Sequence, residues 1–388
     1  MVDVFWKGNF MKRVLILGGG FGGIAAAHRL KQRLGDEVDV ILVDRRETFM
    51  VGFRKSWALV SESTLAAGQK PIDSLSGSGV RVLHDPVRVI EPDARAAYIG
   101  DMRIDADALI VALGAELAPE LIPGFQEHAF NVYDPQAIPR AAEALNEFKG
   151  GRLVIGIFGA PYKCPPAPLE MAMLIQEKFK GSGVEATIEV FTPQPVALPI
   201  LSQDSCDAVD SRLLEKGIRT YGQHKALRIE PGEVVFEKRR IGFDLLLGIP
   251  PHRAPAVVRE SGLAGPSGWV EVDKHTLATK YPDVYAIGDV TQIVMANGKP
   301  LPKAGLFAEM MGETVSERLA DIFEGKEPTA QFSGQGGCYF EVGNGKAMMI
   351  KGNFLAEPTP AVELTEPSRE YYEEKIRFET DRWVKWFG

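Results

Sequence analysis

Cys164 stands in the segment APYKCPPAPLE (160–170), where three prolines follow it within four residues. Because proline fixes its own backbone φ angle, the segment holds the thiol with little conformational freedom ahead of a helix expected at 168–180. The N-terminal dipole of that helix and the adjacent Lys163 would both stabilise a thiolate. Glu170, in the first helical turn, is expected to be a helix-terminus charge rather than a proton carrier. The pattern indicates a reactive sulfur; the alternative is a buried cysteine that acts as a small apolar side chain.

Two further cysteines are present, Cys338 and Cys206. Cys338 lies in GQGGCYFEVGNG, where glycines on both sides allow another backbone to approach closely. Three cysteines are too few for a disulfide scaffold, so any disulfide is expected to be redox-active rather than structural. Sequence spacing alone does not pair Cys338 with Cys164, and it assigns no role to Cys206.

A strand, a glycine-rich turn, a helix and a second strand are expected in succession at 12–17, 18–23, 24–34 and 38–44. Gly18 permits the tight turn, Gly20 lets the backbone approach a pyrophosphate, and Gly23 lets the helix pack on the strand. Asp44 ends the second strand and would accept hydrogen bonds from ribose hydroxyls. Together these residues predict a dinucleotide site, with the pyrophosphate at the helix N-terminus.

A later strand ends in Gly288 and Asp289, which resembles the second half of the FAD site in flavoproteins with two dinucleotide domains. The strand end ALGA, with Ala112 and Gly114, resembles another part of that site. The resemblance implies FAD, with Asp289 bonded to the ribityl chain. Lys303 precedes a helix and would favour the anionic reduced flavin, unless it is a solvated surface lysine.

The expected fold class is α/β, with two Rossmann-like domains, the second inserted in the first, and a C-terminal region. The predicted FAD-binding domain is discontinuous, at 11–116 and 256–325. The inserted domain, 117–255, carries Cys164, and the C-terminal region, 326–388, carries Cys338. The first strand of the inserted domain runs into the cysteine–proline segment instead of a second glycine motif, which disfavours NAD(P) binding.

The motifs GGGFGG, YKCPPAPLE, YAIGDV, PKAGLFAE and GGCYFEVG occur in this order over nearly the whole chain. In this the sequence resembles the sulfide:quinone oxidoreductases and the flavoprotein subunit of flavocytochrome c sulfide dehydrogenase. The resemblance implies a redox disulfide between Cys164 and Cys338 near the flavin. Many quinone-reducing members carry a further cysteine soon after the ALGA strand, often linked to the flavin. Positions 115–130 contain none, so FAD is expected to be non-covalent at that place.

The implied activity is an FAD-dependent oxidation of sulfide. Hydrosulfide would attack the disulfide, leaving a persulfide on one sulfur and a thiolate on the other, and two electrons would pass through FAD to a quinone. One alternative is electron transfer to a c-type haem subunit. An NADH:quinone dehydrogenase and a non-enzymatic redox sensor are further alternatives.

The composition excludes some partners. The net charge is −8 and no basic run is present, so no nucleic-acid partner is expected, and no metal site is expected. No apolar stretch approaches the length of a membrane span, and MVDVFWKGNF does not resemble a secretory signal. In the tail, 369–388, aromatic residues share a helical face that is interrupted at Glu379–Thr380 and flanked by cations: Tyr372, Ile376, Trp383 and Phe387. This pattern fits peripheral contact with a prokaryotic cytoplasmic membrane, and equally a helix that caps its own protein.

Overall fold

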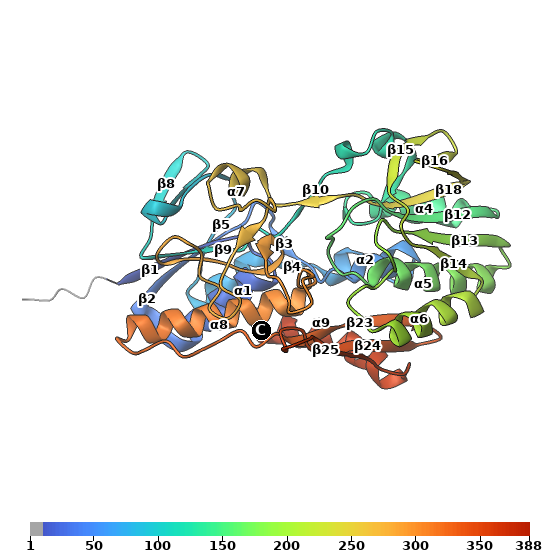
Figure 1. Ribbon diagram of the computed structural model, residues 1–388. Coiled ribbons are helices and arrows are strands. Elements are labelled where there is room, and N and C mark those ends of the chain that lie inside the picture. Colours follow the sequence, from blue (N-terminus) through green and yellow to red (C-terminus); the bar gives the residue numbers. More distant parts are fainter. Residues whose placement is uncertain (1–10) are drawn as a thin grey trace, which may run out of the picture.

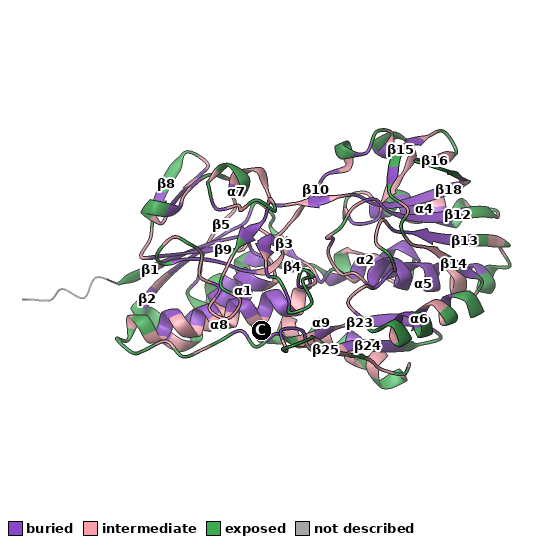
Figure 2. Ribbon diagram, in the orientation of Figure 1, coloured by how far each residue is buried: buried purple, intermediate pink, exposed green. Residues whose placement is uncertain are grey.

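The structure is a computed structural model that describes residues 11–388, so the opening stretch considered for a secretory signal lies outside the described residues. Two parallel five-stranded sheets form the centres of two lobes, and a third, antiparallel sheet with a long helix lies beneath both (Figure 1). Buried residues concentrate in the sheets and in the helices packed on them (Figure 2). The chain therefore has the predicted α/β class.

The first sheet has the order β21-β9-β1-β2-β5. Its strands are β21 (Val284–Ala286), β9 (Ala108–Val111), β1 (Lys12–Leu17), β2 (Val38–Val43) and β5 (Arg81–Leu83). β1, helix α1 (Phe21–Leu34) and β2 make the predicted βαβ unit, with buried apolar strands typical of a sheet covered on both faces. Helix α8 (Gly305–Phe323) packs on α1 so closely that a Cβ at Gly312 would lie 2.3 Å from the Gly22 carbonyl oxygen.

Smaller elements complete the first lobe: β3 (Thr48–Phe49), β4 (Lys70–Pro71), β6 (Val87–Glu91), β7 (Ala96–Ile99), β8 (Met102–Asp105), α7 (Ala256–Glu260), β20 (Val270–Glu271) and β22 (Thr291–Gln292). Helix α2 (Arg54–Leu59) also comes from this part of the sequence, but it packs against helices of the second lobe (Figure 1). The antiparallel pair β10 (Glu116–Leu117) and β19 (His252–Arg253) lies where the chain leaves and re-enters this lobe. The first sheet thus takes strands from both sides of the second lobe in sequence. The exact domain boundaries remain a prediction.

The second sheet has the order β11-β18-β12-β13-β14. Its strands are β11 (Phe130–Asn131), β18 (Leu245–Ile249), β12 (Gly151–Ile157), β13 (Ala186–Phe191) and β14 (Ile218–Tyr221). The lobe also contains α3 (Phe125–His128), α4 (Ile138–Glu147), α5 (Ala167–Ser182), α6 (Gln203–Glu215), β15 (Ala226–Glu230), β16 (Glu233–Phe236) and β17 (Arg240–Gly242). Cys164 lies in the loop between β12 and α5.

The C-terminal region forms the third sheet from β23 (Gln335–Gly343), β24 (Lys346–Asn353) and β25 (Ala361–Leu364), followed by α9 (Arg369–Phe387). Strand β23 contacts α5 of the second lobe and α8 of the first. This placement brings Cys338, in the middle of β23, from the end of the sequence to the junction of the two lobes.

The tail helix packs on the rest of the chain through a face that the sequence did not indicate. The buried residues of α9 are Lys375, Glu379 and Trp386, and the Glu379 carboxylate pairs with Arg54 of α2. Of the predicted face, Ile376 is 40% exposed. The supposed interruption at Glu379 is therefore part of the packed side. No helix within residues 11–388 is both long enough and apolar enough to span a membrane.

Candidate active site

The glycine turn after β1 has the shape needed to hold a dinucleotide pyrophosphate. Gly18 has φ of +112°, and a Cβ there would lie 2.3 Å from the Ala112 carbonyl oxygen, at the end of β9. A Cβ at Gly23 would lie 1.8 Å from the Gly18 carbonyl oxygen. A Cβ at Gly20, in contrast, would meet no atom of the described chain within 4 Å, and neither would one at Gly114. The loop is tight against its own protein yet open beside Gly20, as a bound FAD requires.

Asp44 is buried at the end of β2, next to this turn. Its carboxylate accepts from the Gly19 backbone nitrogen at 2.7 Å and from the Arg46 guanidinium at 2.7 and 3.0 Å. Burial opposes ionisation, but the hydrogen bonds from Arg46 and Gly19 hold the pKa of Asp44 below its usual value. The sequence reading missed Arg46, whose side chain is 58% exposed and covers the carboxylate that was predicted to face the ribose.

Gly20 provides the first test of this site. The Gly20→Val variant should fold normally, because the new side chain enters open space in the protein, but it should occupy the place of the pyrophosphate. A steric cost of about 1–3 kcal/mol corresponds to FAD binding that is about 5- to 150-fold weaker. FAD titration of the apoprotein measures the loss, and circular dichroism checks the fold. Normal FAD affinity in Gly20→Val would contradict the predicted position of the cofactor.

Lys303 is buried, so the alternative of a solvated surface lysine is wrong. Its ammonium donates to the backbone carbonyls of Asp289 at 2.6 Å and Thr291 at 3.2 Å, and it lies 3.6 Å from the centre of the Trp269 ring. Burial lowers the pKa of Lys303 to about 8, against the attraction of Asp289. Lys303 and Asp289 line one small cavity at the start of α8, together with Gly288. Burial also raises the pKa of Asp289, against the attraction of Lys303 and Lys163.

The backbone holds Cys164 firmly. Its nitrogen donates to the Lys303 carbonyl at 2.8 Å, and its own carbonyl accepts from the Tyr133 hydroxyl at 3.2 Å and the Ala167 nitrogen at 3.0 Å. These bonds hold Cys164 at φ of +50°, a conformation that residues with a Cβ seldom adopt. Such constrained backbone is often found at functional sites.

The structure brings Cys164 and Cys338 together. Both are free thiols that are partly buried, and they lie close enough for each to shift the pKa of the other. The interaction with Cys338 lowers the pKa of Cys164, and the interaction with Cys164, together with burial, raises the pKa of Cys338 well above its usual value. The pair is therefore polarised, with Cys164 as the sulfur that becomes a thiolate first. Two cysteines in this contact could form a disulfide and reopen it.

The expectation that Lys163 supplies the cation beside the Cys164 thiol is wrong. The Lys163 side chain interacts instead with Asp289. The cations that act on Cys164 are Lys375 of α9 and Lys55 of α2, neither of which the sequence reading singled out. The chain turns at Cys164, whose backbone is left-handed, so here a neighbour in sequence is a poor guide to a neighbour in space.

Behind the two sulfurs lies a buried group of charged side chains. The Lys375 ammonium pairs with Glu170 of α5 and Glu341 of β23, at 2.8 Å in both cases, and each of the three side chains is at most 3% exposed. The Glu170 carboxylate also accepts from the Glu341 backbone nitrogen at 2.9 Å, and Trp57 donates to Glu341 at 2.9 Å. Burial raises the pKa of Glu170, against the pull of Lys375. Glu170 lies in the first turn of α5, as predicted, and its carboxylate is buried in an ion pair with Lys375.

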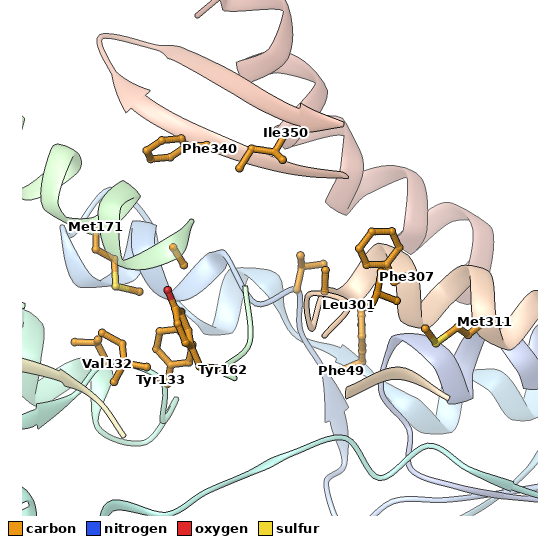
Figure 3. Packing of buried hydrophobic residues seen from close by; sticks show 14 of the residues in the cluster. Phe49, Val132, Tyr133, Tyr162, Met171, Leu301, Phe307, Met311, Phe340 and Ile350 are labelled. Atoms are coloured by element: carbon orange, nitrogen blue, oxygen red, sulfur yellow. The ribbon is translucent and has the colours of Figure 1, made fainter. Parts of the chain in front are cut away.

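A group of aromatic rings closes the side of the site below α5. The rings of Tyr133 and Tyr162 lie together, 6.5 Å apart, with Phe340 on the hairpin above (Figure 3). His252 meets Tyr133 edge-on at 5.6 Å, and its Nδ1–H donates to the Pro250 carbonyl oxygen, 2.9 Å away. Burial and nearby lysines lower the pKa of His252 to about 3, so its ring is neutral near pH 7. The Cys164 backbone is thus surrounded on this side by packed aromatic rings.

Cys206 lies away from this centre. It is buried in α6, its sulfur is 3.4 Å from the Leu198 carbonyl oxygen, and burial raises the pKa of the thiol. This is the environment of an inert, packed cysteine.

Three comparisons agree with this geometry. Residues 12–312 match the family described as Pyridine nucleotide-disulphide oxidoreductase. The mitochondrial sulfide:quinone oxidoreductase of Mus musculus is 27% identical over 363 residues, which cover 89% of this chain and 79% of that protein. The type II NADH:quinone oxidoreductase of Staphylococcus saprophyticus is 24% identical over 344 residues, with coverage of 83% and 85%.

Among solved structures, the sulfide:quinone oxidoreductase of the hyperthermophilic bacterium Aquifex aeolicus superposes with a TM-score of 0.86. The two chains are 20% identical, and the match covers 95% of this chain and 90% of the other. The comparisons confirm the predicted fold class and the predicted resemblance to sulfide:quinone oxidoreductases. They indicate a flavin-dependent oxidoreductase.

Proposed function

Because the chain belongs to the pyridine nucleotide-disulphide oxidoreductase family, we propose that it oxidises sulfide with Cys164 and Cys338 and passes the electrons through FAD to a quinone. The observation that carries this proposal is the contact between two thiols that are 174 residues apart in sequence. Nothing in an FAD site requires such a pair, whereas a sulfide oxidase needs a disulfide that can be opened and re-formed.

The predicted FAD-binding residues fit the cofactor, since the turn is open beside Gly20, Asp44 is hydrogen-bonded to it through Gly19, and Asp289 lines the small cavity with Lys303. The absence of cysteine in positions 115–130 supports non-covalent binding at that place. Bound FAD would supply the acceptor for two electrons. The Lys303 ammonium, held by two backbone carbonyls, would provide positive charge at the pyrimidine side and stabilise the reduced form.

The polarised pair sets the direction of the sulfur chemistry. Hydrosulfide attacks the Cys338 sulfur of the disulfide, the S–S bond breaks, and Cys164 leaves as a thiolate, because the thiol of lower pKa leaves faster. Cys338 then carries the persulfide. A second sulfur nucleophile takes the sulfane sulfur from Cys338 and leaves Cys338 as a thiolate. The two electrons of the thiolate pair would pass to bound FAD, and the Cys164–Cys338 bond would form again.

The quinone and the membrane contact are part of the same proposal. The outer side of α9 carries Ile376, 40% exposed, and Val384, 74% exposed, while its inner side is tied down by ion pairs. These two exposed apolar side chains, among charged ones, are the feature that supports peripheral binding to a lipid surface, from which a quinone would reach the C-terminal region. By family resemblance, we propose that this membrane is the cytoplasmic membrane of a prokaryotic cell.

The decisive experiment is anaerobic reduction of the purified FAD-bound protein. We expect sulfide to bleach the flavin absorbance and NADH to leave it unchanged, because the cysteine segment replaces a second glycine motif. Reoxidation by a soluble quinone, and not by cytochrome c, would support the quinone over a haem partner. Bleaching by NADH but not by sulfide would overturn the proposal in favour of an NADH:quinone dehydrogenase.

A further inference from the structure

The Lys303 ammonium contacts the indole ring of Trp269 as well as two backbone carbonyls. Its Nζ atom lies 3.6 Å from the centre of the ring, which is the distance of a direct cation–π contact. Trp269 is buried, so water does little to weaken this attraction. The Asp289 and Thr291 carbonyl oxygens accept from the same ammonium at 2.6 and 3.2 Å. One aromatic ring and two peptide groups therefore hold the ammonium.

The backbone on both sides of Trp269 is fixed. Val270, the next residue, pairs in register with Thr291 in the small sheet of β20 and β22. The Trp269 carbonyl accepts from the Gly265 nitrogen at 2.8 Å, which closes the preceding turn. Because Thr291 also supplies a carbonyl to Lys303, one pair of strands places both the ring and a hydrogen-bond acceptor against the ammonium.

The three groups that touch the ammonium are uncharged. Within residues 11–388, Lys303 forms no ion pair with a carboxylate, and the Asp289 carboxylate attracts it only from beyond ion-pair distance. A carboxylate in contact would cancel most of the positive charge that a neighbour experiences. Carbonyl dipoles and a π face stabilise an ammonium but leave its charge in place. Lys303 is therefore held as a fixed positive charge in the wall of the small cavity that it shares with Asp289.

We propose that Trp269 is a positioning residue that holds the Lys303 ammonium beside the flavin and so raises the reduction potential of bound FAD. The proposal rests on the proposed function, from which it takes the place of the flavin, and adds a residue to it. Reduction leaves negative charge on the pyrimidine side of a flavin, so a fixed cation there stabilises the reduced form. Without the indole, the ammonium would lose one of the three groups that keep it charged and in place.

The test is the midpoint potential of bound FAD, measured by anaerobic equilibration with an indicator dye. Cys164→Ser and Cys338→Ser are introduced together beforehand, so that the thiol pair takes up no electrons. In Trp269→Leu we expect the equilibrium constant for flavin reduction to fall about tenfold, which is about 30 mV for two electrons. Trp269→Phe keeps a π face and should recover most of this loss.

A double-mutant cycle separates this role from general packing. Lys303→Met removes the charge and should lower the potential at least as far as Trp269→Leu does. Adding Trp269→Leu to Lys303→Met should lower it no further, because the ring then has no ammonium to hold. Lys303→Gln replaces Lys303→Met in the cycle if the methionine variant does not fold. An equal fall in both backgrounds, or an unchanged potential in Trp269→Leu, would overturn the proposal.

Tyr281→Leu is the matched control. The Tyr281 ring packs against the same apolar cluster as Trp269, but the cation over it is Lys280, at 5.2 Å. The potential of this variant should equal that of the parent protein, and a fall as large as that in Trp269→Leu would contradict a specific role for Trp269. Failure of sulfide to reduce the wild-type flavin would instead overturn the proposed function, because the potential is measured without sulfide.

Discussion

Replacing Cys164 with serine is expected to slow flavin reduction by sulfide by about a thousandfold or more, while FAD stays bound. Serine cannot form the disulfide that hydrosulfide attacks, and its hydroxyl is far too basic to replace the Cys164 thiolate. The glycine turn and Asp44 are untouched by the change, so the flavin content should match that of the wild type. Anaerobic stopped-flow absorbance with excess sulfide measures the rate.

Matched variants separate this chemistry from a general loss of structure. Cys338→Ser should be as inactive as Cys164→Ser, since each removes one half of the same bond. Cys206→Ser should reduce at the wild-type rate, because that thiol is packed in α6 against the Leu198 carbonyl. If Cys164→Ser retained rapid reduction by sulfide, the redox pair would have no part in the reaction.

The second large effect concerns stability. In Lys375→Met, Glu170 and Glu341 would remain buried without their shared cation, and breaking a buried pair in this way typically costs about 3–5 kcal/mol. Burial already raises the pKa of Glu170, and loss of Lys375 would raise it further. A carboxyl group whose folded pKa is raised destabilises the fold most at high pH, so the loss should be larger at pH 8 than at pH 5. Thermal unfolding at both values measures this difference.

A surface pair provides the control. The Lys274 ammonium meets the Glu357 carboxylate at 2.5 Å, but both side chains are exposed to solvent. Lys274→Met should therefore change the unfolding midpoint little at either pH. A loss in Lys375→Met that was small, or that did not depend on pH, would mean that the buried carboxylates are protonated or solvated in the folded protein.

Local sequence patterns predicted much of the fold. The strand predicted at 12–17 is β1, and the helix predicted at 168–180 lies within α5, Ala167–Ser182. Both segments have apolar runs bounded by glycine or proline, so local chemistry decides their structure. The tail helix was recognised as a helix, but Glu379, which was taken as a break in an apolar face, is buried in a pair with Arg54.

The charged groups of the site were beyond sequence reasoning. Glu341 lies in an apolar strand and could have been flagged as a charge in a buried setting, yet nothing along the chain identifies Lys375 as its partner. Lys55 likewise lies more than 100 residues from Cys164. Such contacts depend on how separate lobes pack, and neither periodicity nor spacing records that packing. The family resemblance, in contrast, identified both cysteines, because it rests on the order of several motifs along the whole chain.

The backbones of Lys163 and Lys303 form an isolated parallel β-bridge, and the Cys164 backbone nitrogen donates to the Lys303 carbonyl oxygen at 2.8 Å. Backbone hydrogen bonds therefore set the distance between the Cys164 segment and the Lys303 segment at the proposed flavin edge. Such bonds do not depend on which side chains the segments carry. Substitutions among the surrounding apolar side chains would therefore change that distance little. Inserting or deleting a single residue in either segment would shift the register between them. The length of these segments is therefore more important than their composition.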